Sequence, residues 1–122
     1  DRDQEWLFKE ILKPGEEVLK AITDCRIKDI HPAKTHRSPV GVFVATNQRV
    51  LFIIPKISKE TQIEEYAYDQ VTSVGICKTP YWSGCVDFVA GPVKRTVFWI
   101  NPKSDAEEIV RVIRDRVKAL KS

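Results

Sequence analysis

The sequence predicts a mainly β domain, in which seven antiparallel strands form a sandwich or small barrel and one C-terminal helix closes it. Short runs of β-branched and aromatic residues, separated by turn signals, occupy most of the chain. A helical stripe of apolar residues follows them after Ser104. No helical pattern lies between consecutive strands, so the crossovers of a parallel nucleotide-binding sheet are not expected.

The strand pattern is clearest around Asn47 and Gln48, where the runs GVFVAT and RVLFII flank a turn and predict a hairpin. The run EVLKAITDCRIKDI before it alternates imperfectly, which predicts a long strand with an irregularity. Further runs follow, punctuated by turn signals that include Gly91 and Pro92. The seven strands are expected at residues 17–30, 41–46, 49–54, 62–68, 71–78, 85–90 and 95–100.

A short amphipathic helix is expected at the start of the chain. Residues 3–12 carry apolar side chains at helical spacing, and Pro14 and Gly15 end the pattern. We therefore divide the chain into an N-terminal helix with its lead-in, residues 1–15, and a β domain, residues 16–122.

The C-terminal helix is expected to begin at a capping box. The Ser104 hydroxyl and the Glu107 carboxylate are spaced so that each can accept a hydrogen bond from a free backbone N–H. The apolar stripe that follows requires a sheet to cover. It consists of Ala106, Ile109, Val110, Ile113, Val117 and Leu120.

Both faces of the 41–54 hairpin are apolar. We place Val42, Val44, Val50, Phe52 and Ile54 on one face, and Phe43, Ala45, Leu51 and Ile53 on the other. A sandwich strand normally has one polar face, so the outer side of this hairpin needs cover. The N-terminal helix with Trp6, Leu7 and Phe8, or the C-terminal helix, is the first choice for this cover, and a second copy of the chain is the next.

Three motifs, in this order, resemble those of a known family. They are LKPGEEVL from Leu12, VATNQRVLFI from Val44 and YDQVTSV from Tyr68. They are similar to motifs of bacterial pleckstrin-homology (PH)-like domains of the YokE type, which are related to GRAM domains. The resemblance extends over nearly the whole chain and implies two roughly orthogonal antiparallel sheets with a capping helix. It implies no particular ligand, because this fold hosts lipid-binding, peptide-binding and assembly roles.

A basic segment in and before the loop at residues 31–40 is the first candidate ligand site. Its cations are Arg26, Lys28, His31, Lys34, His36 and Arg37. In lipid-binding PH domains this loop holds a phosphoinositide headgroup through several cations. The lipid motif is incomplete here, because Thr35 stands two positions before Arg37, and a solvated basic loop is the alternative interpretation. We select Lys28, Lys34, His36, Arg37 and Arg49 as candidate ligand-binding residues.

Arg49 has a second interpretation. It starts the third expected strand, where it could extend the basic patch. The alternative is a structural role, in which the guanidinium bonds carbonyl groups of the hairpin or a nearby acid.

Four aromatic residues are candidate protein contacts. Trp6 and Phe8 belong to the N-terminal helix, and Tyr81 and Trp82 lie on a turn between two strands. Large aromatic side chains dominate many protein interfaces. For Tyr81 and Trp82 the alternative is a pair of rings folded over their own sandwich.

Composition and spacing exclude several function classes. The 20 basic and 17 acidic residues give a net charge of +3, too small a surplus to predict nucleic-acid binding. His31 and His36 lack a nucleophile signature and a metal-binding spacing. We therefore expect no catalysis, no metal and no cofactor. No segment has the roughly 18 consecutive apolar residues of a membrane span.

The three cysteines, Cys25, Cys77 and Cys85, show no CxxC spacing. Cys77 and Cys85 could face each other across a hairpin, but we interpret all three as free, buried thiols. Free thiols favour a reducing compartment, so a cytoplasmic location is expected.

The sequence thus predicts a non-enzymatic binding or assembly module. Its expected partner is another protein or a second copy of the same chain, which would make a homo-oligomer. The alternative is a peripheral membrane module that binds anionic lipid headgroups through the basic first loop.

Overall fold

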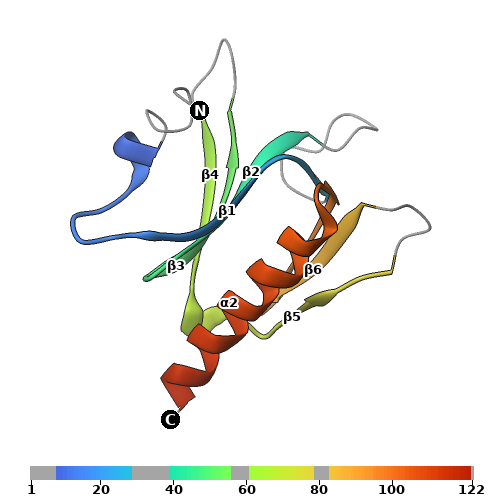
Figure 1. Ribbon diagram of the computed structural model, residues 1–122. Coiled ribbons are helices and arrows are strands. Elements are labelled where there is room, and N and C mark those ends of the chain that lie inside the picture. The colour runs from blue at the N-terminus through green and yellow to red at the C-terminus, as the bar shows by residue number, and fades with distance from the viewer. Residues whose placement is uncertain (1–7, 29–38, 56–60, 79–82, 122) are drawn as a thin grey trace.

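The computed structural model describes residues 8–28, 39–55, 61–78 and 83–121. Seven antiparallel strands form one open sheet in the order β4-β3-β2-β1-β7-β6-β5, and a helix covers one end of it (Figure 1). The strands are β1 (Val18–Lys28), β2 (Val40–Thr46), β3 (Arg49–Ile54), β4 (Gln62–Ala67), β5 (Ser73–Ile76), β6 (Gly84–Ala90) and β7 (Val93–Ile100). A 3-10 turn, η1 (Tyr68–Gln70), follows β4, and the long helix α2 (Lys103–Lys121) follows β7. The predicted fold class is confirmed.

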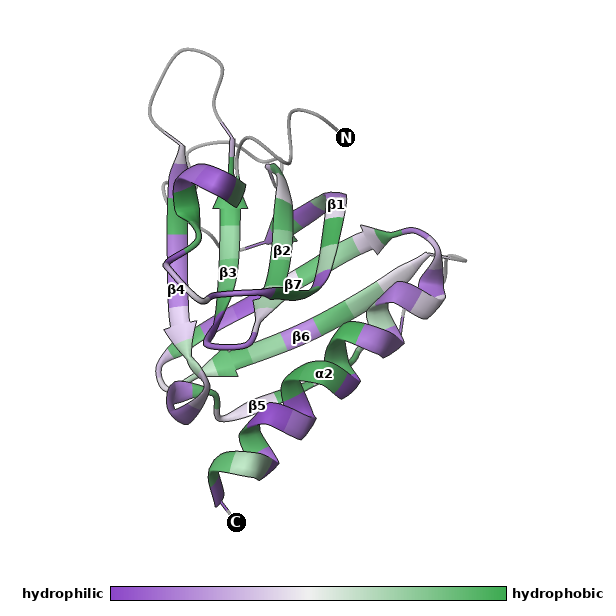
Figure 2. Ribbon diagram, turned by 60° about the vertical axis from the view of Figure 1, so that its left-hand side comes forward, coloured by the Kyte–Doolittle hydropathy of each residue, from purple (hydrophilic) through white to green (hydrophobic). Residues whose placement is uncertain are grey.

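The first strand, β1, joins two halves of the sheet. It pairs with β2 from Val18 to Arg26 and with β7 from Arg26 to Lys28. Its register against β2 shifts between Ile22 and Cys25, where Asp24 has a φ of 58°. A bulge of this kind bends a strand and increases its twist. The irregularity predicted in this strand is therefore present, and it separates the half-sheet β4-β3-β2-β1 from the half-sheet β1-β7-β6-β5 (Figure 2).

The core between the half-sheets is built on four aromatic rings. Phe43 and Phe52 stack with centroids 5.0 Å apart, and Phe88 of β6 meets Phe52 edge-on at 5.1 Å. Tyr66 of β4 lies 5.5 Å from Phe88. Offset and edge-to-face contacts of this kind are favourable beyond the area that they bury.

The C-terminal helix α2 packs its apolar stripe on β5, β6 and β1 (Figure 2). Ala106, Ile109, Val110 and Ile113 are buried, and the opposite side of the helix is polar. Gly84 permits the close approach, because a Cβ at this position would lie 2.8 Å from the Ala106 Cβ.

The two ends of α2 differ from the prediction. The helix begins at Lys103, so Ser104 lies inside the first turn and is not the N-cap residue. Lys20 of β1 connects the N-terminal end of α2 to the sheet through ion pairs of 2.9 Å to Asp105 and to Glu108. At the other end Leu120 is 60% exposed, because the last turns of α2 extend past the sheet (Figure 1).

The register of the β2–β3 hairpin corrects the predicted face assignment. Phe43 lies opposite Phe52 and Val44 lies opposite Leu51, and directly opposed residues share a face of the sheet. Phe43, Ala45, Val50, Phe52 and Ile54 therefore face the core, whereas Val42, Val44, Leu51 and Ile53 form the outer face. The prediction assigned the core face of β2 to the same side as the outer face of β3. A shift of one residue in the pairing of two strands is enough for this error, because it moves every side chain of one strand to the opposite face.

The outer face of the β2–β3 hairpin is covered from within the chain. Phe8 and Ile11 of the N-terminal segment, with Val18 and Ala21 of β1, pack on it. Residues 8–11 are helical, and the Leu12 N–H donates to the Phe8 carbonyl at 2.8 Å. The intramolecular cover that we ranked first is thus present, with Phe8 in the expected place.

Candidate binding surface

The outer side of the half-sheet β1-β7-β6 is the candidate site. Ile27 of β1 lies opposite Val97 of β7, and both are fully buried. Their neighbours on each strand therefore point outward. We call this surface the Trp99 face. It comprises Arg26 and Lys28 of β1, Lys94, Thr96, Phe98 and Trp99 of β7, and Asp87 of β6.

Trp99 is the extra residue of a β-bulge. The β7 residues Phe98 and Ile100 pair with the consecutive β6 residues Cys85 and Gly84, so Trp99 has no opposite residue on β6. Its φ is 60°, a conformation that residues with a Cβ rarely adopt. The side chain is nevertheless 54% exposed. The chain thus holds a large aromatic ring in a strained backbone position and leaves half of it in contact with water.

Neighbouring side chains hold the Trp99 indole in place. The Arg26 guanidinium carbon lies 5.2 Å from the ring centroid, a cation–π distance. Phe98 meets the indole edge-on with centroids 5.8 Å apart. These two contacts restrict the orientation of the indole in the folded chain.

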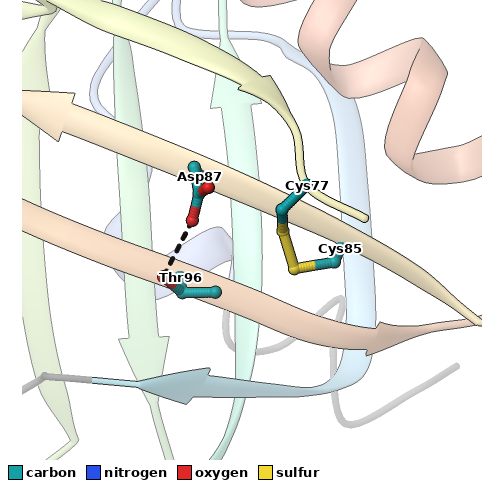
Figure 3. Close-up of a disulfide and its surroundings, with 4 residues drawn as sticks. All are labelled: Cys77, Cys85, Asp87 and Thr96. Atoms are coloured by element: carbon teal, nitrogen blue, oxygen red, sulfur yellow. Dashed lines mark hydrogen bonds between the residues drawn. A yellow bond between two sulfur atoms is a disulfide. The ribbon is translucent and has the colours of Figure 1, made fainter. Parts of the chain in front are cut away.

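One hydrogen bond and one disulfide connect neighbouring strands in this half of the sheet (Figure 3). The Thr96 hydroxyl donates to the Asp87 carboxylate at 2.9 Å. Cys77 and Cys85 form a disulfide between the end of β5 and the start of β6. The interpretation of Cys77 and Cys85 as free thiols was wrong. Their facing positions in the expected 71–78 and 85–90 strands were the signal for this bond.

Cys25 is the free thiol among the three cysteines, and it is buried. Burial raises the pKa of this thiol to about 12, so it stays protonated at neutral pH. It is consequently an inert part of the core.

Arg49 lies away from solvent, within a network of internal partners. Its Nε and one Nη each donate to a Glu16 carboxylate oxygen at 2.9 Å, and the same Nη donates to the Ile11 carbonyl at 3.0 Å. The other Nη bonds the Glu65 carboxylate. These bonds fasten the N-terminal segment to β3 and β4, which agrees with the structural interpretation of Arg49.

Glu16 is the buried centre of this network. The Thr46 hydroxyl donates to it at 2.6 Å and the Lys13 N–H at 3.0 Å. Burial by itself would raise the pKa of Glu16, but the hydrogen bonds from Arg49, Thr46 and Lys13 together outweigh it and lower the pKa to about 2.

The remaining predicted site residues are only partly described. Lys28 is exposed at the end of β1, on the Trp99 face. Phe8 packs on the hairpin, as shown above. The others lie outside the described residues: Trp6, Lys34, His36, Arg37, Tyr81 and Trp82.

Trp99 and Phe98 were not among the predicted site residues. The run RTVFWI contains two adjacent large aromatic residues, which cannot both face a core across a regular strand. That break in alternation was the available signal for a bulge.

Several solved structures are similar to this chain. The Vps36 N-terminal PH domain superposes with a TM-score of 0.65 at 13% identity, over 90% of this chain and 85% of that chain. A DUF1696 family protein with a pleckstrin-homology domain from Shewanella loihica gives a TM-score of 0.60 at 15% identity, over 95% and 92%. A pleckstrin homology domain from Shewanella amazonensis gives 0.62 at 14% identity, over 94% and 96%. At these identities the likeness shows the fold alone.

The sequence itself gives the family. No curated protein matches the chain. The family model described as "Bacterial PH domain" matches residues 12–115, which include all seven strands and most of α2. The chain therefore belongs to the bacterial PH domain family.

Proposed function

We propose that this domain is a non-enzymatic binding module that recognises a protein partner through the Trp99 face. One observation carries the proposal: Trp99 keeps a half-exposed indole at a φ of 60°. Such a backbone conformation costs on the order of 1–3 kcal/mol and is found most often where it serves function. The half of the indole that stays exposed contributes little to the stability of the fold.

The composition of the Trp99 face fits a protein contact. Trp and Arg are the residues most enriched at the energetic centres of protein interfaces. Here Arg26 and Trp99 lie in contact, and Thr96 and Asp87 provide polar groups beside them. An aromatic centre with a polar rim is the usual anatomy of such an interface.

The architecture supports a binding role over catalysis. PH-like folds generally serve as binding modules. Among the residues that the structure describes, no group of three or more His, Cys, Asp or Glu side chains could hold a metal ion. No helix in the described ranges is long and apolar enough to cross a bilayer.

A comparison of variants in affinity capture tests the proposal. The wild-type chain, Trp99→Gly and the control Leu120→Ala are immobilised and exposed to extract of the source cell, and the retained proteins are quantified. Leu120 is the matched control because it is also a large exposed apolar residue. We expect a protein that the wild type and Leu120→Ala retain and that Trp99→Gly retains at least roughly tenfold less, the size of a hot-spot loss. Equal retention by all three chains would refute the role of Trp99.

Binding to anionic lipid is the second candidate, and one observation favours it. Lys28 and Lys94 are both exposed on the Trp99 face, and Lys28 directly precedes the loop in which Lys34, His36 and Arg37 are predicted to bind a headgroup. Sedimentation with phosphatidylcholine vesicles, with and without phosphatidylserine, tests it. Binding that requires phosphatidylserine, weakens with salt and disappears in Lys34→Glu/Arg37→Glu supports this candidate. An absence of sedimentation at low salt dismisses it.

The observation that first suggested self-association was an uncovered apolar face on the 41–54 hairpin. In the structure, Phe8 and Ile11 cover that face. A homo-oligomer therefore stays a prediction, and light scattering of the chain at high concentration decides it.

The finer assignments also stay predictions. These are the YokE-type and GRAM relationship and the division of the chain at residue 15. The prediction of a cytoplasmic location rested on free cysteines, and the Cys77–Cys85 disulfide removes that support, because disulfides persist mainly in oxidising compartments.

A further inference from the structure

A groove lies between the edge strand β5 and the helix α2, on a different surface from the Trp99 face. Its volume is about 310 Å³. Its apolar lining comes from Val71, Val74 and Val117, and Thr72, Ser73, Arg114 and Lys118 complete the wall. A hollow of this size accommodates one or two apolar side chains.

The strand β5 offers main-chain groups beside this groove. The Cys77 N–H donates to the Cys85 carbonyl at 3.1 Å, so the main-chain groups of Gly75 and Ser73, by alternation, also face β6. Those of Val74 and Ile76 point away from β6, toward the free edge of the sheet. Arg114 confirms this direction, because its Nε donates to the Val74 carbonyl at 3.0 Å. The edge of a sheet can accept an extended segment of another chain. The Val74 carbonyl is already bonded to Arg114, so such a segment would pair with the Val74 N–H and with Ile76.

A row of cations on α2 borders the same groove. Arg111, Arg114, Lys118 and Lys121 recur at intervals of three and four residues, which places them on one side of the helix. All four are exposed, and the same spacing places two exposed acids beside them, Glu107 before Arg111 and Asp115 between Arg114 and Lys118. The Arg114 side chain lies along β5, with its Nε bonded to the Val74 carbonyl and one Nη beside Gly75, and it lines the groove. The positive row is complementary to a segment that carries carboxylates.

We infer that this groove binds an extended segment of a partner polypeptide, in which an apolar side chain is flanked by acidic residues. The apolar side chain fills the space between Val71, Val74 and Val117. The acidic residues lie beside the cationic row of α2, of which Arg114 and Lys118 line the groove, and the segment runs along the outer edge of β5. This site goes beyond the proposed function, because it is independent of Trp99.

Peptide titration tests the inference on the 122-residue chain. The probe is the synthetic peptide EDVLVDE, monitored by amide NMR shifts and by fluorescence anisotropy of a labelled copy. One control peptide, QNVLVNQ, lacks the charges, and another, EDSGSDE, lacks the apolar residues. We expect shifts confined to residues 71–76 and 110–121, salt-sensitive binding of EDVLVDE, and at least roughly fivefold weaker binding of each control.

Matched charge variants locate the site. Arg114→Gln/Lys118→Gln removes two cations at the groove, and Arg26→Gln/Lys94→Gln removes two on the Trp99 face. We expect roughly fivefold weaker binding from the first pair and no change from the second. Arg111→Gln/Lys118→Gln, which leaves the Arg114 bond to β5 intact, is expected to weaken binding in the same direction.

The outcomes separate this inference from the proposed function. Absent shifts, equal binding of the three peptides, or equal effects of the groove and Trp99-face variants would each overturn the groove. Shifts that map to Trp99 and Arg26 would overturn it as well, while supporting the Trp99 face. Trp99→Gly is expected to leave binding of EDVLVDE unchanged, so the two sites can fail separately.

Discussion

The two outer faces of the sheet are treated in opposite ways. On the β2–β3 half, Val42, Val44, Leu51 and Ile53 are covered by the N-terminal segment. On the β6–β7 half, Trp99 stays 54% exposed. The covered face is held by the buried ion pair of Arg49 and Glu16, whereas the exposed face presents a large aromatic ring at a φ of 60°. The covered half thus contributes apolar burial to the fold, and the exposed half is the surface that we propose for binding.

The same contrast appears in how each face uses arginine. Arg49 is buried and bonds Glu16, Glu65 and the Ile11 carbonyl, so it fastens the cover to the sheet. Arg26 lies over the Trp99 ring on the other half. Substitution of each arginine should therefore affect a different property of the protein.

Arg49→Ala is expected to have the largest effect. It leaves the Glu16 carboxylate buried without its cation, which should lower the free energy of unfolding by about 3–5 kcal/mol. Urea unfolding measures the change, with Arg26→Ala as the control, for which a loss below about 1 kcal/mol is expected. A loss below about 1 kcal/mol in Arg49→Ala would show that the network does not fasten the N-terminal segment.

Acid should weaken the same network. The pKa of Glu16 is lowered from 4.5 to about 2 in the folded chain, so its contribution is fully present above pH 4.5 and is lost as the pH falls toward 2. That contribution is of the order of 3 kcal/mol. Unfolding free energies measured between these pH values should fall for the wild type. In Glu16→Gln the fall should be smaller, and an equal fall in both chains would contradict the assignment.

Phe8→Ala removes part of the cover itself. Because Phe8 is only partly buried, we expect a loss of about 1–2 kcal/mol, below that of a fully buried phenylalanine. Thermal or urea unfolding measures it beside Leu19→Ala, which alters a side chain that is 37% exposed. If both substitutions cost the same, Phe8 would not cover the hairpin.

Substitutions of Trp99 on the exposed face are expected to give the smallest changes in the free energy of unfolding. Trp99→Gly should change the free energy of unfolding by less than about 1 kcal/mol, because relief of the φ of 60° offsets the lost ring contacts. Trp99→Ala should be about 1 kcal/mol less stable than Trp99→Gly, since its Cβ retains the strain. Equal stability of the two variants would mean that the backbone is not held in this conformation.

Most of the fold could be predicted from local patterns. Arg49–Ile54 was placed to the residue, and the irregularity in 17–30 appears as the bulge at Asp24. These features depend on alternation and on turn residues, which act over a few neighbours. The faces of the hairpin were assigned wrongly, because local apolar content is nearly equal on both sides and only the pairing of Phe43 with Phe52 settles the register.

The candidate site was less accessible to sequence reasoning. The predicted ligand residues were chosen for charge along the chain, and Arg49 among them is held by Glu16, which lies 33 positions earlier. To predict the Cys77–Cys85 bond, one must know that β5 and β6 pair in one particular register. Trp99 was overlooked because an apolar residue in a strand normally faces a core.

By itself, the sequence determined the seven strands, the closing helix and the family, since each depends on short-range pattern or on motif order. Only the tertiary structure decided which side chains are covered and which meet water. Burial depends on contacts between segments far apart in the chain, such as Phe8 on the β2–β3 hairpin and Arg26 on Trp99. Local spacing does not encode those distances, and for this reason the surface proposed for binding emerged only from the folded chain.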